Sequence, residues 1–308
     1  MLKYIIKRVL VAGVSMFLLI TITFFLMHAI PGSPFNAGER KNLNPEVIEA
    51  IEAQYGLNLP VHEQYINYVK NLLHGDMGLS MKKLNYSVNE LISDSFPVSA
   101  QIGFFAVIVA LAVGIPLGVV AALKRGGVAD MLSMTLATVG ISIPTFVIAL
   151  LLMYLFCMKL AWLPPYGWGE LKHFILPVAC LSLAPIANIT RLTRSTLMEV
   201  VQQDYIRTAR SKGLSEFVVI GKHAMRNAIV PVVTYLGPLV AGLMTGSFAI
   251  ERMFMAPGIG RYFVNSVSDR DYTMIMGVTI FYGLFIMVCT LIVDIAYAII
   301  DPRVRLDS

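Results

Sequence analysis

The segment DYIRTARSKGLSEFVVIGKHAMRNAIVP, Asp204–Pro231, lies between two long apolar runs of the chain. Its charge sets it apart from the sequence on either side. Five basic side chains surround Gly213, namely Arg207, Arg210, Lys212, Lys222 and Arg226. The fold class therefore depends on whether the flanking apolar runs cross a membrane. The function depends on what this basic segment binds.

The composition of the whole chain is that of an integral membrane protein. Of its 308 residues, 57% are hydrophobic and 14% are charged, and the mean hydropathy is +0.72. Soluble domains carry about 25% charged residues. Cys157, Cys180 and Cys289 all fall in apolar runs without a metal-like spacing, so we expect neither a disulfide framework nor a metal site.

Six apolar stretches approach or exceed the roughly 20 residues that a helix needs to cross a bilayer core. They are Val9–Ile30, Phe96–Leu123, Met131–Met158, Phe174–Thr190, Asn227–Ile250 and Thr273–Ile300. The fourth is short and contains Pro177 and Pro185, which predicts a kink. The expected fold class is therefore an all-α membrane protein with six transmembrane helices.

The distribution of basic residues predicts the orientation of these spans. Lys3, Lys7 and Arg8 precede a first span that is too long for a signal peptide and lacks a small-residue cleavage site, so we expect a retained signal anchor. Of the 24 Lys and Arg residues, 14 fall on the side of the N-terminus and 10 on the other side. By the positive-inside rule, both termini and the basic segment are predicted to be cytoplasmic.

The predicted spans divide the chain into regions. These are a signal-anchor helix (residues 1–30), an extracytoplasmic helical insert (31–95), a transmembrane core (96–300) that contains a cytoplasmic loop (191–226), and a cytoplasmic tail (301–308). In the insert, Asn44-Pro45-Glu46 predicts a helix start and Gly56 a helix stop. A second, amphipathic helix is predicted at Val61–Leu73, and we expect both helices to form a small cap that packs on the spans. The apolar side of the second helix consists of Tyr65, Val69, Leu72 and Leu73.

Enzyme motifs that act in or beside membranes are incomplete in this chain. His62-Glu63 begins a zinc-protease motif, but Ile66 stands where the second histidine is required. Asp294 is the single aspartate within a predicted span, whereas an intramembrane aspartyl protease needs two. Ser247 has no histidine in its span, and Gly221-Lys222 lacks the upstream glycine of a phosphate-binding loop. We therefore predict no catalytic residue, and any ATP that drives this protein must be bound by another chain.

Asp294 admits two interpretations. It lies seven residues before Asp301, roughly 10 Å along a helix, and hence near the inner interface. An aspartate there could couple transport to an ion or proton, or it could bond a neighbouring helix. The structural role is favoured, because ion-coupled carriers usually hold more than one ionisable group in the membrane.

Glycine and proline in the predicted spans indicate close packing and bends. The pairs Gly114/Gly118 and Gly242/Gly246 are spaced so that two helices can approach closely. The prolines expected to bend spans two, three and five are Pro116, Pro144 and Pro238. Such bends suit a translocation path, although they also occur in passive scaffolds.

The local pattern divides the loop into short helical pieces. Residues 191–203 are expected to continue the fourth span as a helix. Asp204 is the expected N-cap of a two-turn helix over Tyr205–Lys212, and Gly213 supplies the left-handed residue that ends it. Ser215 then caps a further helix that runs toward the fifth span.

Three explanations of this loop remain open on the residues alone. An ordinary positive-inside loop explains its charge but not its capped, glycine-ended helix. Contact with anionic lipid through Arg207, Arg210 and Lys212 is the second explanation. Docking of a partner protein is the third.

Four motifs, in order along the chain, resemble those of the peptide/nickel family of ABC importer permeases. YIRTARSKGL (205–214) resembles the loop by which importer permeases dock on their ATP-hydrolysing subunits, with Arg207 in place of the usual Glu. KHAMRNAIVP (222–231) stands where the general motif has I-x-L-P, as in the peptide/nickel group. GSFAIERMFMAPGIG (246–260) and DIAYAIIDPRVR (294–305) resemble two further family segments. The start MLKYIIKRVL and the insert PEVIEAIEAQYGL resemble the B-type subunit of oligopeptide permeases.

This resemblance implies a type I ABC importer permease fold in the cytoplasmic membrane of a prokaryote. The implied partners are a paralogous permease that completes a heterodimer, two ATP-binding subunits that carry ATP and Mg, an extracytoplasmic peptide-binding protein, the peptide substrate and membrane lipid, without nucleic acid. The chain itself is expected to bind no cofactor. The residues expected to couple to the ATPase subunit are Asp204, Tyr205, Arg207, Thr208, Ala209, Arg210, Lys212 and Gly213.

Within this coupling helix, Ala209 is expected to keep the helix slim enough to enter a cleft on the ATPase, and Gly213 to permit the turn. Arg207, Arg210 and Lys212 are expected to pair with acidic groups there. Oligopeptide import is the expected activity. Import of dipeptides or nickel chelates, an ion-driven carrier, and a scaffold without transport are the alternatives.

Overall fold

The computed structural model describes residues 2–29, 50, 52–83 and 85–300, and these form helices joined by short turns. Within these ranges, the antiparallel bridge between Leu79 and Ser87 is the one strand-like pairing. Backbone contacts divide the chain into two units, Met1–Val98 with Pro257–Met287 and Ser99–Ala256 with Val288–Ser308. The all-helical class predicted from the sequence is confirmed.

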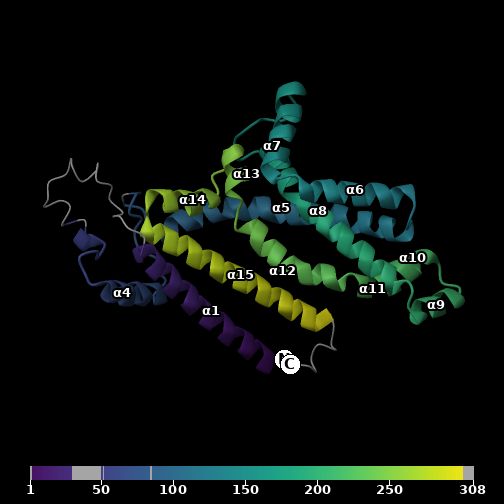
Figure 1. The fold of residues 1–308 in the computed structure, drawn as a ribbon, viewed down its shortest axis with the longest axis horizontal. Coiled ribbons are helices and arrows are strands. Elements are labelled where there is room, and N and C mark those ends of the chain that lie inside the picture. The colour runs from purple at the N-terminus through teal and green to yellow at the C-terminus, as the bar shows by residue number, and fades with distance from the viewer. Residues whose placement is uncertain (1, 30–49, 51, 84, 301–308) are drawn as a thin grey trace. The chain divides into compact units, whose positions relative to one another are not determined.

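The first unit is built from helices that are far apart in the chain. Its elements are α1 (Leu2–Ala29), α4 (Val61–Leu73), the start of α5 (Val88–Leu123), α14 (Gly260–Asp269) and the first part of α15 (Tyr272–Ile300). Figure 1 shows α1 in purple running beside α15 in yellow, and buried Phe24 and Met27 of α1 pack against Met276 and Ile280 of α15. The first and last predicted spans are therefore neighbours in this unit.

The predicted helix over Val61–Leu73 is confirmed as α4, which covers this helix pair. The α4 side chains that pack against the α1–α15 cluster are Tyr65, Tyr68 and Leu72. Leu73 is 81% exposed, so the helical periodicity placed it wrongly on the packed side. Gly56 has the positive φ (+65°) expected of a helix stop, whereas the predicted start at Asn44-Pro45-Glu46 lies outside the described residues.

A buried carboxylate ties the segment after α4 to the first turn of α15. Asp271 is 3% exposed and accepts hydrogen bonds from Ser80 Oγ (2.5 Å) and from the backbone N–H of Met81 (3.1 Å). The backbone N–H of Met274, in α15, donates a third bond (3.0 Å). These donors offset the desolvation of the charge, which would be strongly destabilising without them.

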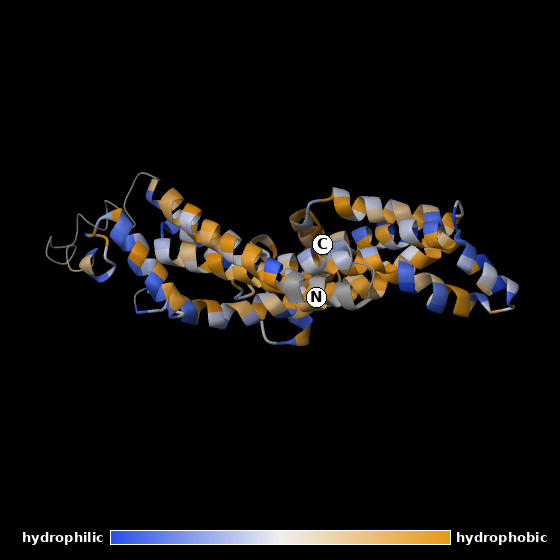
Figure 2. Ribbon diagram, turned by 90° about the horizontal axis from the view of Figure 1, so that it is seen from below, coloured by the Kyte–Doolittle hydropathy of each residue, from blue (hydrophilic) through white to orange (hydrophobic). Residues whose placement is uncertain are grey.

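The second unit holds the remaining helices. They are the rest of α5, α6 (Val128–Ser142), α7 (Thr145–Met153), the π-helix η1 (Tyr154–Lys159), α8 (Leu171–Val200), α9 (Asp204–Ser211), α10 (Glu216–Val218), the π-helix η2 (Val219–Ala224), α11 (Met225–Ala228), α12 (Val230–Met244), α13 (Phe248–Met253) and the end of α15. Figure 2 shows hydrophobic residues along the long helices and more hydrophilic residues near the end where Figure 1 places α9. Five of the described helices are long and apolar enough to cross a membrane, or six if the bent pair α6 and α7–η1 forms one span.

The third predicted span, Met131–Met158, is not one straight helix. α6 and the α7–η1 helix meet at a bend of 102°. Ile143 has extended backbone angles (φ −92°, ψ 126°) because it precedes Pro144, whose ring disfavours a helical conformation of the residue before it. The bend predicted at Pro144 is therefore confirmed, but its size divides the span in two.

Spans four and five also differ from their predicted bounds. The fourth, expected as the short stretch Phe174–Thr190, belongs to the 30-residue helix α8, because the predicted extension 191–203 continues the same helix to Val200. The fifth, expected at Asn227–Ile250, is interrupted between α12 and α13, where Gly246 has φ +92°. Spans two and six are confirmed, although α5 begins earlier than expected, at Val88.

The glycine pair of α5 has the predicted role and the pair of α12 does not. A Cβ on Gly114 would lie 2.9 Å from the Ile189 Cβ, and a Cβ on Gly118 would lie 2.5 Å from the Thr193 Cβ, so α5 and α8 approach closely at both glycines. At Gly242 no atom lies within 4 Å of an added Cβ. Gly246 is instead needed for the helix break.

Candidate functional site

The predicted coupling segment, Asp204–Gly213, lies between the end of α8 and α10. It contains α9, and Gly213 follows with φ +76°, the left-handed conformation predicted for the residue that ends the helix. The predicted N-cap is wrong by one position, because α9 begins at Asp204 and Gln203 is the N-cap, without a side-chain hydrogen bond. Ser215 is the N-cap of α10, as predicted.

One face of α9 is buried against the chain's own helices. Ile206 is fully buried and Ala209 is 6% exposed, in a cluster with Leu197 of α8 and with Val219 and Ile220 of η2. Ala209 therefore packs inside this chain, which contradicts the expectation that its small size serves a cleft on a partner. The i, i+3 spacing of Ile206 and Ala209 in the sequence is itself a signal of this inner face.

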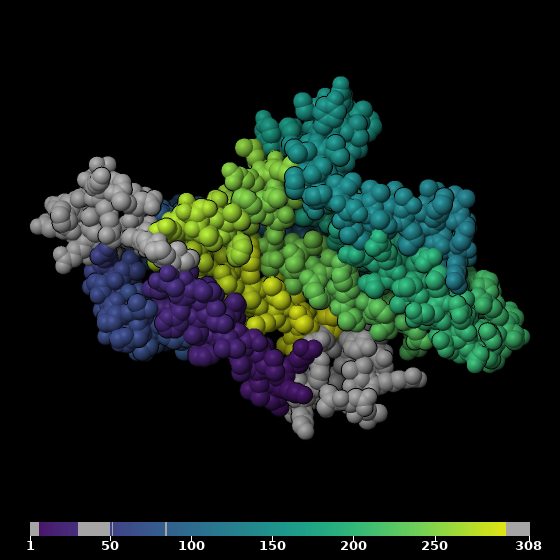
Figure 3. Space-filling view, viewed as in Figure 1, coloured from purple at the N-terminus to yellow at the C-terminus, as the bar shows by residue number. Residues whose placement is uncertain are grey.

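The opposite face of α9 is exposed and polar. Its exposed residues in the coupling segment are Asp204, Tyr205, Arg207, Thr208, Arg210, Ser211, Lys212 and Gly213. The Thr208 hydroxyl donates to the Asp204 carbonyl (3.0 Å) within the helix, and the Tyr205 hydroxyl accepts a hydrogen bond from Asn227 Nδ2 of α11 (2.7 Å). Figure 3 shows this segment, in green, at the surface. The structure thus fixes the first turn of α9 and leaves the charged side chains of Arg207 and Lys212 facing outward.

Arg207 pairs with Asp204 within α9 (3.8 Å), and Arg210 pairs within the chain as well. The Nε and Nη2 of Arg210 donate to the two carboxylate oxygens of Glu216, over 2.7 and 3.2 Å. The Arg210–Glu216 pair spans the turn at Gly213 and therefore favours the observed arrangement of α9 and α10. The same arginine lowers the pKa of Glu216 below its usual value.

Acidification is expected to loosen this turn. Because the folded pKa of Glu216 is below its unfolded value, its stabilising effect is complete above the unfolded pKa, about 4.5, and is lost as the pH falls through the folded pKa. Amide hydrogen exchange of residues 213–218, the turn and α10, should therefore accelerate relative to that of α9 as the pH is lowered below about 4.5. In Glu216→Gln the exchange should already be fast at pH 7 and should show no such step. An identical pH profile in both proteins would contradict the role of the pair.

A groove of 820 Å³ opens beside the coupling segment, between the ends of α5 and α8 and the α10–η2 helix. Its wall is mainly apolar, and its rim carries Arg125 and the Arg210–Glu216 pair. Phe217 lies at this rim and is 89% exposed. A large exposed aromatic next to a charged rim is typical of a surface that a partner protein covers.

An ion pair joins α8 to α6 near this groove. The Arg194 guanidinium donates to both carboxylate oxygens of Asp130, over 2.6 and 2.8 Å, and the Gly126 N–H donates to the same carboxylate (3.0 Å). A bidentate pair of this kind fixes the relative position of two helices. The pair therefore ties the end of α8, beside the candidate site, to α6 in this structure.

The break in the fifth span contains a buried charge, Glu251, which directly follows the predicted span Asn227–Ile250. Glu251 of α13 is 2% exposed, and its Oε1 accepts hydrogen bonds from Ser99 Oγ of α5 (2.7 Å) and from the Ser247 N–H (3.2 Å). Ionisable groups buried in apolar spans usually have a functional or packing role. The signal available in the sequence was the glycine of GSFAIE, which permits a chain reversal onto the glutamate four residues after Ser247.

Two family matches and several full-length relatives show which family this chain belongs to. Residues 114–306 match the family described as "Binding-protein-dependent transport system inner membrane component", and residues 1–102 match its N-terminal membrane component. The chain belongs to this permease family. It is 48% identical to the oligopeptide permease OppB of Escherichia coli K12 over 307 residues, covering 99% of this chain and 100% of OppB. It is 47% identical to the dipeptide permease DppB of Bacillus subtilis over 306 residues, covering 99% of each chain.

The fold of this binding-protein-dependent permease is also found among solved structures. An inward-facing structure of the methionine ABC transporter MetNI covers 68% of this chain and 96% of its own, with a TM-score of 0.55 and 12% identity. The resemblance to peptide ABC permeases is thereby confirmed. Membership of the family implies ATP-binding subunits and a substrate-binding protein as partners. The side chain of Asp294 lies outside the described residues, although its backbone belongs to α15.

Proposed function

We propose that this chain is the membrane-spanning subunit of an ATP-driven importer of peptides, with oligopeptides as the main substrate. The observation that carries the proposal is the exposed polar face of α9, held by an apolar inner face and ended by Gly213 at φ +76°. A short, rigid, surface helix between two membrane-crossing segments is suited to receive a push from an ATPase subunit. The contacts that differ between the ATP-bound and ATP-free states would be made there.

The packing of α8 suggests how such a push would reach the membrane. α9 packs on Leu197 near the end of α8, which is continuous from Leu171 to Val200. The Asp130–Arg194 pair extends the connection to α6. Displacement of α9 would thus move α8 and α6 together. Their motion would open the substrate path alternately to the two sides of the membrane.

The orientation and the partners complete the proposal. The N- and C-termini and the coupling segment face the cytoplasm, and the insert 31–95 faces the extracytoplasmic side. A paralogous permease forms the second half of the membrane path, two subunits hydrolyse ATP, and an extracytoplasmic protein delivers the peptide. Relatives named for oligopeptide and for dipeptide transport are equally similar, so a dipeptide is the alternative substrate.

Reconstitution tests this function against an ion-driven carrier. In liposomes that contain the permease pair, the ATPases and the binding protein, omission of the ATPases should abolish peptide uptake. Asp294→Asn should retain most of the uptake, because the proposed energy source is ATP rather than an ion gradient. Uptake that needs Asp294 and an ion gradient but not ATPase subunits would instead support the carrier. Competition between dipeptides and pentapeptides in the same liposomes identifies the preferred substrate.

A further inference from the structure

Two basic side chains and a tyrosine meet at the surface of the first unit. They are Lys83, in the turn before α5, and the neighbours Arg261 and Tyr262 in the first turn of α14. Lys83 and Arg261 are exposed, whereas Tyr262 is partly buried. The Tyr262 ring packs against a buried cluster that includes Val88 and Met274. The phenol is therefore held in place by the core of the unit while its hydroxyl reaches the surface.

Both cations converge on the phenol oxygen. Lys83 Nζ donates to Tyr262 Oη over 2.8 Å, and Arg261 Nη2 donates to the same oxygen over 3.2 Å. Because the two bonds share one acceptor, the two nitrogens are no more than about 6 Å apart. Lys83 Nζ and the Arg261 guanidinium carbon each lie 4.7 Å from the centroid of the Tyr262 ring, which also attracts them. The tyrosine thus gathers two positive charges at one point.

Neither charge is balanced within the described part of the chain. No carboxylate among the described residues forms an ion pair with Lys83 or Arg261. Two like charges this close repel each other, and an anion between them would relieve the repulsion. Since the Tyr262 oxygen accepts both bonds, its own O–H hydrogen can donate, and no acceptor for it lies among the described residues. An ammonium, a guanidinium and a phenol are therefore available to one external anion.

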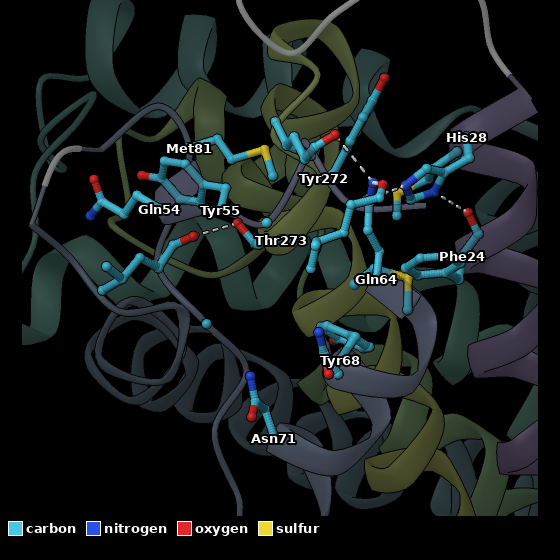
Figure 4. A pocket seen from close by; sticks show the side chains of 18 of the residues that line it. Phe24, His28, Gln54, Tyr55, Gln64, Tyr68, Asn71, Met81, Tyr272 and Thr273 are labelled. Carbon is cyan, nitrogen blue, oxygen red and sulfur yellow. Dashed lines mark hydrogen bonds between the residues drawn. The ribbon is translucent and has the colours of Figure 1, made fainter. Parts of the chain in front are cut away.

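The backbone around Lys83 holds it in this position. A β-bridge between Leu79 and Ser87 brackets Lys83 in the chain. The Lys83 N–H donates to Ser80 Oγ (2.9 Å), which itself bonds the buried carboxylate at the start of α15. Figure 4 shows Thr273 of α15, whose hydroxyl donates to the Leu79 carbonyl (2.6 Å). The ammonium is thus presented by a backbone that is anchored at several points.

The surroundings favour a protein carboxylate over a lipid phosphate. Asn265 and Ser268 are exposed and follow Arg261 by four and seven positions, so all three share one side of α14. The large exposed apolar residues of α14 are Phe263 and Val267, two and six positions after Arg261 and hence on the other side of the helix. A lipid held at Arg261 would therefore find polar rather than apolar side chains next to it on this helix.

From this arrangement we infer that Lys83, Arg261 and Tyr262 bind an acidic side chain of the extracytoplasmic protein that delivers the peptide. The carboxylate lies between the two cations and accepts hydrogen bonds from them and from the phenol. An exposed ion pair alone contributes little to affinity, so an open site of this kind holds a small peptide poorly. Within a protein–protein interface the same charges speed association and fix the orientation of the partner. The inference rests on the proposed function, which places the insert that contains Lys83 on the extracytoplasmic side.

Docking of the peptide-loaded binding protein on the complete transporter in nanodiscs, without ATP, tests the site by biolayer interferometry. The double variant Lys83→Gln, Arg261→Gln should weaken docking about five- to tenfold at about 50 mM salt, and the difference should shrink to about twofold or less at about 1 M. Tyr262→Phe keeps the net charge and the packed ring, yet it should weaken docking about two- to threefold because the cations lose their common acceptor and the carboxylate loses a donor. Lys70→Gln removes an exposed charge of α4 in the same unit and is the matched control, which should dock like the wild type.

Neutralisation of the acidic residues of the binding protein, one at a time, identifies the partner carboxylate. The relevant change should weaken docking on the wild type and have no further effect on the double variant. Docking unaffected by the double variant, or weakened as much by Lys70→Gln, would overturn the inference. With docking unchanged, a raised KM for a free tripeptide but not for its C-terminal amide would assign the site to the peptide instead. Absence of ATP-driven uptake by the wild-type complex would overturn the proposed function, while the docking result, which needs no ATP, would stand.

Discussion

Gly246→Val is expected to abolish peptide uptake and to destabilise the second unit by about 2–5 kcal/mol. Gly246 has φ +92°, a backbone conformation that a β-branched residue rarely adopts. An added Cβ would also lie 2.4 Å from Glu251 Oε1 and 2.9 Å from Ser99 Oγ. Neither atom can move away without breaking the Ser99–Glu251 hydrogen bond, so backbone strain and steric overlap act together.

Thermal unfolding of the purified complex and uptake in liposomes measure this effect. Gly242→Ala is the matched control, since an added Cβ there meets no atom within 4 Å and alanine favours the helix. The double variant Gly246→Val, Glu251→Ala removes the overlap with the carboxylate and keeps the backbone strain. Partial recovery in the double variant would assign the remaining loss to the φ angle together with the overlap on Ser99, whose Oγ lies 2.9 Å from the added Cβ. A Gly246→Val protein as stable and active as Gly242→Ala would show that the break in the fifth span is not required.

Sequence patterns predicted the continuous helices well because one local property determines each of them. An apolar run of sufficient length predicts α1 and α15, and the 3.6-residue period predicts α4. The left-handed residue at the end of α9 follows from Gly213 alone, since glycine adopts a positive φ without strain. The position of this part of the candidate site could therefore be read before the structure was known.

Features that depend on tertiary contacts could not be read in the same way. Gly246 fits a close-packing motif and a helix break equally well, and the choice depends on Glu251 bonding Ser99, which is 152 residues away. The size of the bend at Pro144 likewise depends on how α6 and α7 pack on α8. Arg210 looked available to a partner because its ion pair crosses a non-helical turn to Glu216, six residues on, where helical spacing gives no guide.

Ala209→Trp is expected to cause the largest loss of uptake among substitutions in the coupling segment, followed by Gly213→Leu, with Lys212→Ala close to wild type. Ala209 lies in a cluster with Ile206 and Val219, both fully buried, so an indole there overpacks the interior by about 1–3 kcal/mol or more and displaces α9 from α8. At Gly213 an added Cβ meets no atom within 4 Å, so the loss comes from the φ of +76° and is smaller. The exposed Lys212 makes at most a surface ion pair, worth about 0–1 kcal/mol.

Because Ala209 is buried inside the chain, Ala209→Trp is expected to lose uptake by uncoupling it from ATP hydrolysis rather than by unfolding the protein. If α9 receives the push from the ATPase, Ala209→Trp should uncouple the complex, so that ATP hydrolysis no longer responds to the peptide-loaded binding protein while the basal rate persists. Hydrogen exchange should show protection lost in α9 but retained in the middle of α8, which separates a displaced coupling helix from global unfolding. Ala209→Ser, nearly the same size, is the matched control and should stay coupled. Normal stimulation in Ala209→Trp would mean that the ATPase acts on this permease somewhere other than α9.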